Sequence, residues 1–143
     1  MDEFLVGVVG NCAAGKTTLV KGLTATGYKA VNIPQEHSVT PRFWRKLNVD
    51  YLVMLSCNLA TAKRRRRIPW GQERLEAQAA KLADARANCQ LYLPTDHLTI
   101  EQVLQAVIAA ITKYREERRD VGEDYSGRRE ASSTGGNVPE VRP

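Results

Sequence analysis

Residues 4–17 read FLVGVVGNCAAGKT, and this stretch determines the fold class that we expect for the chain. Its first six residues are a short, continuous apolar run, which is typical of a strand buried on both faces of a parallel sheet. A glycine-rich turn from Gly10 to Gly15 follows, and Lys16 then opens a segment with apolar residues at helical spacing, at Leu19, Val20 and Leu23. Gly27 supplies a common C-terminal stop. These residues predict a buried strand, a glycine-rich turn and a helix over residues 16–26.

The rest of the chain alternates between strand-like and helix-like segments. Strands are expected over residues 28–33, 51–55 and 90–93, and helices over residues 40–47, 59–67, 72–88 and 99–114. The helix over residues 72–88 should bury Leu75, Ala79 and Leu82 on one face. The last helix should begin with a capping box formed by Thr99 and Gln102. This alternation predicts an α/β domain with a mainly parallel sheet.

Length and composition indicate a single globular domain. The chain has 143 residues, of which 43% are hydrophobic and 26% are charged, close to the averages for globular proteins. No apolar stretch approaches the ~20 residues that span a bilayer, and the acidic N-terminus does not resemble a secretory signal. Cys12, Cys57 and Cys89 lie too far apart in sequence for a disulfide or zinc-ligand pattern. We therefore expect a cytoplasmic protein with reduced thiols and no membrane partner.

The net charge of +5 is concentrated in one place. Residues 113–143 hold seven basic and seven acidic groups, and the run from Lys63 to Arg67 alone supplies five positive charges. A nucleic-acid-binding face would spread its basic residues more widely, so this distribution argues against nucleic acid as a partner. Residues 115–143 lack apolar periodicity and are expected to be a disordered, charged tail that follows a domain over residues 1–114.

The segment from Gly10 to Thr17 matches the phosphate-binding pattern G-x-x-x-x-G-K-[ST] between a strand and a helix. Its glycines permit successive backbone amides to face one concavity, and the helix N-terminus adds partial positive charge. Lys16 is expected to be a solvent-facing charge that reaches the β- and γ-phosphates of a nucleoside triphosphate. Thr17 should place its hydroxyl on Mg²⁺. The nucleotide-binding residues expected here are Gly10, Asn11, Cys12, Ala13, Ala14, Gly15, Lys16, Thr17 and Thr18.

From this motif onward the chain resembles the P-loop kinases of small molecules, the superfamily of nucleoside, nucleotide and shikimate kinases. The resemblance covers roughly residues 4–112 and rests chiefly on the loop from Gly10 to Thr17. A second signal is the apolar segment over residues 50–55, followed by the basic run that starts at Lys63. The resemblance implies a three-layer P-loop NTPase-like fold, with a parallel sheet flanked by helices and a short helical lid over about residues 64–88. It also implies ATP and Mg²⁺ as cofactors.

The resemblance also implies roles for residues outside the loop. Glu36, in a segment similar to the Glu-Arg-Ser element of deoxynucleoside kinases, would hold Mg²⁺ or accept the proton of a substrate hydroxyl; a solvated loop carboxylate is the alternative. Arg65 and Arg67 fall where such kinases place lid arginines that neutralise the transferring phosphoryl group, although a solvated basic helix face fits them too. Arg86 and Asp96 match further positions that contact nucleotide.

The sequence also departs from the family pattern. The family's second apolar strand often ends in Leu-Asp, whereas this one ends in Leu55-Ser56, which leaves Glu36 as the substitute acid. Phe43 and Trp44 could stack on a planar substrate or form the buried face of their own helix. The leading hypothesis is transfer of the γ-phosphoryl group of ATP to a small hydroxyl-bearing acceptor, nucleoside-like or sugar-like. The alternative is a regulatory module that binds ATP, or hydrolyses it slowly, without an acceptor.

Overall fold

The computed structural model describes residues 4–125 of the chain. Its centre is a four-stranded parallel sheet in the order β2-β1-β3-β4. The strands are β1 (Leu5–Gly10), β2 (Lys29–Asn32), β3 (Tyr51–Ser56) and β4 (Leu91–Pro94). Each strand begins and ends within one residue of its predicted bounds, and the expected α/β class with a parallel sheet is confirmed.

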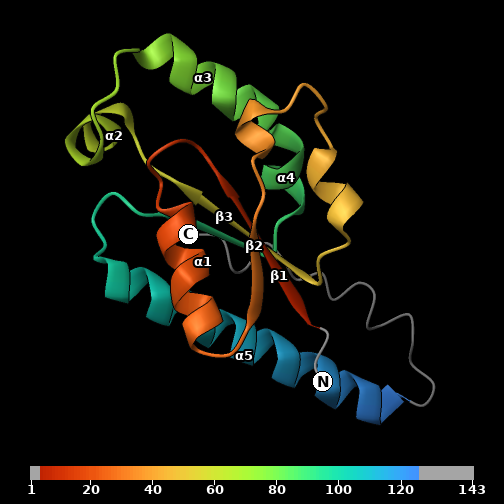
Figure 1. The fold of residues 1–143 in the computed structure, drawn as a ribbon. Helices are drawn as coiled ribbons and strands as arrows, with labels where there is room; N and C mark the ends of the chain where they lie inside the picture. Colours follow the sequence, from red (N-terminus) through yellow and green to blue (C-terminus); the bar gives the residue numbers. More distant parts are fainter. Residues whose placement is uncertain (1–3, 126–143) are drawn as a thin grey trace.

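Helices lie on both faces of the sheet (Figure 1). The α-helices are α1 (Lys16–Ala25), α2 (Leu59–Arg65), α3 (Gln72–Lys81), α4 (Ala83–Asn88) and α5 (Ile100–Tyr125), and the 3₁₀ helices are η1 (Gln35–His37) and η2 (Phe43–Leu47). Gly27 follows α1 with a φ of 103°, and the amide of Tyr28 donates to the carbonyl of Leu23. This is a glycine stop of the kind that the sequence predicts.

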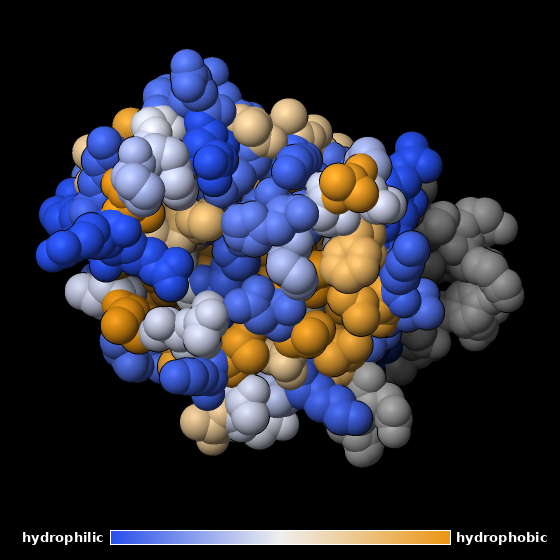
Figure 2. All heavy atoms as spheres, turned by 45° about the horizontal axis from the view of Figure 1, so that its top comes forward, coloured by the Kyte–Doolittle hydropathy of each residue, from blue (hydrophilic) through white to orange (hydrophobic). Residues whose placement is uncertain are grey.

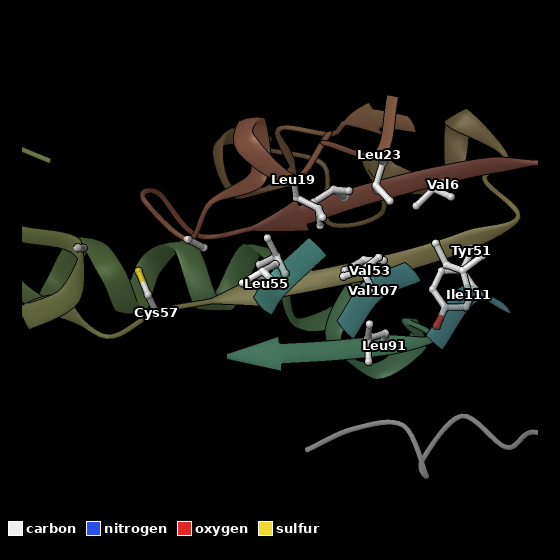
Figure 3. Packing of buried hydrophobic residues seen from close by; sticks show 14 residues of the cluster. Val6, Leu19, Leu23, Tyr51, Val53, Leu55, Cys57, Leu91, Val107 and Ile111 are labelled. Carbon is white, nitrogen blue, oxygen red and sulfur yellow. The ribbon is translucent and has the colours of Figure 1, made fainter. Parts of the chain in front are cut away.

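Two apolar clusters hold the helices on the sheet, because successive strand residues point to opposite faces. Val6 and Val8 of β1 pack with α1 and α5, and Figure 3 shows side chains of both helices meeting those of β1 and β3. Val9 of β1 lies in the other cluster. The first cluster includes Leu19, Leu23, Tyr51, Val53, Leu55, Leu91, Val103, Val107 and Ile111. The second includes Ile33, Leu52, Met54, Leu82, Ala85 and Cys89.

The predicted helix over residues 72–88 is two helices in the structure. The backbone breaks at Leu82, where φ is −96° and ψ is 0°, and Leu82 itself is buried in the second apolar cluster. This bend turns α4 onto the sheet while α3 directs Gln78 toward the loop after β1. Ala79, which was expected to be buried, is exposed, and Gln78 is buried instead. The last part of the predicted lid, residues 82–88, therefore packs on the sheet.

The predicted helix over residues 40–47 is also wrong in its first half. Only the 3₁₀ helix η2 forms, and it begins at Phe43. The buried side chain of Gln35 explains the difference, because it accepts a hydrogen bond from the amide of Trp44 at 2.8 Å and donates to the carbonyl of Thr40 at 2.7 Å. These backbone groups are bonded by a side chain rather than by an α-helical turn. The helix α2 likewise ends at Arg65, two residues before its predicted end.

Helix α5 begins as predicted but continues beyond Tyr114 to Tyr125. The hydroxyl of Thr99 accepts from the amide of Gln102, whose side chain accepts from the amide of Thr99, so the capping box is confirmed. Past the last buried residue, the ring of Tyr114 packs edge-on against Tyr51 with centroids 4.9 Å apart. Aromatic contacts and good helix formers thus extend the helix into a segment that was expected to be disordered. The remainder of that segment, residues 126–143, lies outside the described residues.

Because all four strands are parallel, their carboxyl ends meet at one edge of the sheet. The chain passes from β1 to β2 on one side and then crosses to β3 on the other, so β1 and β3 flank the topological switch point where open α/β sheets bind ligands. Figure 2 tilts the upper part of Figure 1 forward and shows a surface in which hydrophilic side chains surround smaller apolar patches. Among the described helices, none is both long enough and apolar enough to cross a bilayer.

Candidate functional site

The glycine-rich loop joins the end of β1 to α1 at this switch point. A Cβ atom on Gly10 would collide with the carbonyl oxygen of Leu55 on the neighbouring strand, so only glycine fits there. Ala13 and Gly15 adopt left-handed backbone conformations, with φ values of 66° and 105°. Gly15 does so at little cost, whereas Ala13 accepts strain of roughly 1 kcal/mol or more. The glycines therefore stand where close packing and a tight turn require them.

Lys16 folds back across the loop instead of extending into solvent. Its ammonium group donates to the carbonyl oxygens of Gly10 at 2.9 Å and Asn11 at 3.2 Å, and to Oε2 of Glu36 at 2.8 Å. Three acceptors satisfy its three N–H donors. Only 9% of the Lys16 side chain is exposed, so the expectation of a solvent-facing charge is wrong. The carboxylate of Glu36 draws the ammonium down onto the loop.

Glu36 lies on η1, directly after β2, with only 4% of its side chain exposed. Its Oε2 atom pairs with Lys16 and lies 3.4 Å from Nε2 of His37. Its Oε1 atom is buried and has no hydrogen-bond partner. A buried carboxylate oxygen without a partner carries a desolvation penalty that a water molecule or a cation would relieve. Glu36 therefore retains an unused coordination position beside Lys16.

Asn11 and Gln78 fix the loop from two other directions. The Asn11 side chain accepts from the amide of Cys57, at the end of β3, at 3.0 Å and donates to the carbonyl of Cys12 at 2.9 Å. Burial raises the pKa of the Cys57 thiol, although a hydrogen bond from Asn11 opposes that rise. Gln78 of α3 accepts from the amide of Cys12 at 2.9 Å and donates to its sulfur at 3.3 Å. The buried side chain of Asn11 thus ties the loop to the end of β3.

Thr17 and Thr18 are exposed at the start of α1. The hydroxyl of Thr17 accepts a hydrogen bond at 3.1 Å from the side-chain amide of Asn32, the last residue of β2. Thr18 instead lines a cavity of about 480 Å³ between α1 and the start of α5. The cavity walls also include Gly15, Leu19, Arg65, Thr95, Leu98, Ile100 and Leu104.

Arg65 binds the loop itself. Its guanidinium donates to the carbonyl of Ala13 at 2.9 Å and to both the hydroxyl and the carbonyl of Thr95, after β4. The Thr95 hydroxyl in turn donates to the carbonyl of Ala14 at 2.9 Å. Arg65 thus supports the strained peptide of Ala13 and closes one side of the cavity. Arg67 follows the end of α2 and is exposed.

The two remaining predicted contact residues have other partners. The guanidinium of Arg86 lies 3.7 Å from the ring centroid of Tyr92 on β4, a cation–π contact. The Asp96 carboxylate accepts from the amide of Asn58 at 2.7 Å, just before α2. Burial alone would raise the pKa of Asp96, but several interactions, led by the bonds from the amide of Asn58 and the side chain of Thr61, lower it. The structure therefore gives Arg86 and Asp96 packing and capping roles.

The end of β3 carries no acid, as the sequence indicates. The Ser56 hydroxyl is hydrogen-bonded at 2.9 Å to the hydroxyl of Tyr92 on the adjacent strand. The acid that pairs with the lysine is thus Glu36, the substitute acid that the sequence predicts. Gln78, Asn32 and Thr95 were missed; of these, only Gln78 gave a signal, as a polar residue between the apolar Leu75 and Leu82 at helical spacing.

Comparisons of this chain with protein-family models, with curated proteins and with solved structures found no match. The function must therefore be argued from the site and its chemistry.

Proposed function

We propose that the loop from Gly10 to Thr17 is a P-loop that binds ATP with Mg²⁺, and that the protein transfers the γ-phosphoryl group to a small hydroxyl-bearing acceptor, nucleoside-like or sugar-like. The observation that carries this proposal is the position of Lys16. Its ammonium lies over a tight glycine loop at a helix N-terminus, 2.8 Å from a buried carboxylate. Such a loop offers amides, a helix dipole and a lysine to the same phosphate groups.

Glu36 supplies the acid–base chemistry in this proposal. A phosphate group that approaches the loop competes with Glu36 for Lys16, and the released carboxylate becomes available for Mg²⁺ or for the acceptor's proton. The unpartnered Oε1 atom supports this role, because the carboxylate has coordination capacity even while it pairs with Lys16. The Thr17 hydroxyl is the second oxygen that we assign to Mg²⁺.

The cavity beside α1 suits the nucleoside part of ATP. Its volume of about 480 Å³ falls within the ordinary range for small-molecule sites, and Gly15 and Thr18 of the proposed P-loop and its helix form part of its wall. Leu19, Leu98 and Leu104 offer apolar surface to a base, and Thr95 and Arg65 offer polar groups at its edge. A nucleotide with its phosphates on the loop could therefore place its base in this cavity.

The test is a binding and transfer experiment on the full chain. Titration with a fluorescent ATP analogue and Mg²⁺ should show saturable binding that unlabelled ATP reverses. A thermal-shift screen of nucleosides and sugars, with and without a non-hydrolysable ATP analogue, should identify an acceptor through cooperative stabilisation. An absence of saturable ATP binding would refute the proposal. Binding of ATP without any cooperating acceptor would support the P-loop assignment but not the transfer of the phosphoryl group.

Two observations favour the alternative of an ATP-binding regulatory module. Arg65, the arginine expected to stabilise the transferring phosphoryl group, is bound to Ala13 and Thr95, and Ser56 replaces the usual acid at the end of β3. A module of this kind would bind ATP at the same loop and hydrolyse it slowly without an acceptor. Its hydrolysis rate would be insensitive to Glu36→Gln, whereas the kinase requires that carboxylate.

A further inference from the structure

Three potential metal ligands from separate parts of the sequence meet beside the loop. One ligand atom each from Cys12, Glu36 and His37 lies within 4.8 Å of the others. The Cys12 sulfur is 3.7 Å from Nε2 of His37, and the same nitrogen is 3.4 Å from Oε2 of Glu36. The fold creates this cluster by bringing η1, after β2, against the loop after β1. It was invisible in the sequence, where Cys12 stands alone.

The spacing matches a tetrahedral ion. A tetrahedral Zn²⁺ ion with bonds of about 2.3 Å to sulfur and about 2.0 Å to nitrogen or oxygen separates its ligand atoms by roughly 3.3–3.6 Å. Two of the three ligand separations, 3.7 Å and 3.4 Å, lie close to that range before any adjustment by an ion, and the third is at most 4.8 Å. The ligand set of one sulfur, one nitrogen and one carboxylate oxygen favours Zn²⁺ over Mg²⁺, which prefers oxygen ligands alone.

A catalytic triad fits the same residues less well. In a Cys–His–acid triad the acid binds one ring nitrogen of histidine and the thiol binds the other. Here Nε2 of His37 faces both the sulfur of Cys12 and the carboxylate of Glu36. Three potential ligand atoms that converge on one region are typical of a metal-coordination site rather than of a proton relay.

Two further observations point to a ligand. Only 4% of the Glu36 side chain is exposed, and its Oε1 atom is buried without a hydrogen-bond partner. The side-chain amide of Gln78, itself 3% exposed, donates to the Cys12 sulfur at 3.3 Å and so orients that sulfur as an outer partner of a metal ligand does. We propose that Cys12, Glu36 and His37 bind a divalent cation of the Zn²⁺ class, with the fourth position open to water.

Zinc binding has a consequence for the neighbouring loop. The ion engages Glu36, the carboxylate assigned above to Mg²⁺ or proton transfer, and it ties Cys12 of the loop to η1. Zn²⁺ therefore inhibits phosphoryl transfer at the Mg²⁺-dependent site. The inhibition rests on the proposed kinase function, whereas the zinc site itself does not, so the two can fail separately.

Direct binding to the full chain without an affinity tag tests the site. Competition with a chromogenic chelator should show one Zn²⁺ per chain, and Co²⁺ should give the near-ultraviolet charge-transfer absorption of a thiolate–metal bond. Cys12→Ser and His37→Ala should each weaken Zn²⁺ binding on the order of 100-fold or more, and Cys12→Ser should abolish the charge-transfer band. His97→Ala, at the chain's other exposed histidine, is the matched control and should leave Zn²⁺ affinity unchanged.

The site would be overturned if the wild-type protein bound no stoichiometric Zn²⁺, or if the Cys12→Ser variant kept wild-type zinc affinity. Both variants should keep the wild-type melting temperature without metal, because Ser preserves the shape of Cys12 and His37 is 58% exposed. A Thr17→Ala variant separates the two proposals, since it should weaken Mg²⁺–ATP binding and leave zinc affinity intact. Equal loss of both would show that a single site binds both metals and would refute the separate zinc site.

Discussion

The ammonium nitrogen of Lys16 lies 2.8 Å from Oε2 of Glu36, twenty residues further along the chain, and both side chains are more than nine-tenths buried. The pair therefore links the loop after β1 to the segment after β2 through charges that water screens poorly. Each charge satisfies the other, and removal of either one leaves its partner buried and uncompensated. The folding of this edge and the availability of the lysine to a ligand are thus coupled.

A double-mutant cycle should reveal that coupling in the free energy of unfolding. Lys16→Met should destabilise the domain by about 3–5 kcal/mol, because it leaves the Glu36 carboxylate buried without its partner. The double variant Lys16→Met/Glu36→Gln should recover a large part of that loss, because neither charge remains. Urea denaturation of the two single variants and the double variant measures the interaction. Lys21→Met, at an exposed lysine of the same helix, is the control and should change stability by less than about 0.5 kcal/mol. Strictly additive effects would show that the ion pair does not form in solution.

Glu36→Gln should separate nucleotide binding from phosphoryl transfer. The amide keeps the shape of the side chain but neither competes as an anion for Lys16 nor accepts a proton. ATP affinity measured without Mg²⁺ should therefore equal or exceed that of the wild type, while transfer falls by about 10²-fold or more. Fluorescence titration and a coupled turnover assay give the two quantities. Transfer at the wild-type rate would remove Glu36 from the mechanism and favour the regulatory module.

The cavity beside α1 can be tested by filling it. Thr18→Trp places a large ring in the cavity from an exposed position on α1, so it should raise the Kd for ATP by about tenfold or more, roughly 1.4 kcal/mol. Inorganic triphosphate, which has no base, should bind both proteins equally. Thr24→Trp, further along the same helix and outside the cavity wall, is the control. If triphosphate affinity falls as far as ATP affinity, the base does not occupy this cavity.

Asp84 should make stability depend on pH in the acid range. Its carboxylate accepts from Arg45 through two bonds of 3.0 Å and from the indole of Trp44 at 2.9 Å, which ties η2 to α4. The hydrogen bond from Arg45 is the main cause that lowers the pKa of Asp84 in the folded state. Its contribution to stability is therefore fully present above the unfolded value of about 3.9 and is lost as pH falls through the lower folded value. Asp84→Asn should lower the melting temperature at pH 7, and the difference from wild type should shrink below about pH 4. A constant difference across that range would show that the ionised carboxylate contributes nothing.

Most of the sheet could be predicted from the sequence because its signals are local. The strand β1, the glycine loop and α1 follow from apolar periodicity and glycine spacing within 24 consecutive residues. The break at Leu82 and the short η2 helix could not be predicted in this way. They depend on the core that Leu82 enters and on the side chain of Gln35, which bonds backbone groups five and nine residues away. Tertiary contacts decided those two elements against local propensity.

In the candidate site, too, residues marked by local sequence could be predicted, whereas contacts between distant segments could not. Lys16 and Glu36 could be selected from the sequence because a motif and a strand end mark them. The other contacts arise between distant segments: Asn11 with Cys57 is 46 residues apart and Cys12 with Gln78 is 66. Without a register for the strands, no spacing in the sequence reveals such pairs. Arg65 shows the converse, because its position near the loop was predicted but its partners were not.

Arg65 and Arg67 should now behave differently, although the sequence treats them alike. Arg65 donates to the carbonyl of Ala13 and to Thr95, so Arg65→Ala should lower the melting temperature by a few degrees and weaken ATP binding by releasing the loop. Arg67 is exposed beyond the end of α2 and free to approach a bound phosphate. Arg67→Ala should leave the melting temperature unchanged and lower turnover by about 10²-fold, with little change in ATP affinity.

The comparison needs one control for each arginine. Arg65→Lys keeps the charge but cannot form the forked contact with Thr95, so it should reproduce most of the stability loss. Arg66→Ala removes a neighbouring exposed arginine and should leave both turnover and stability near wild type. Thermal unfolding, ATP titration and turnover measured on all four variants distinguish the two roles. If Arg67→Ala turns over at the wild-type rate while Arg65→Ala slows transfer without any loss of stability or affinity, then Arg65 is the arginine that acts on the phosphoryl group, and its contacts with Ala13 and Thr95 must open when ATP binds.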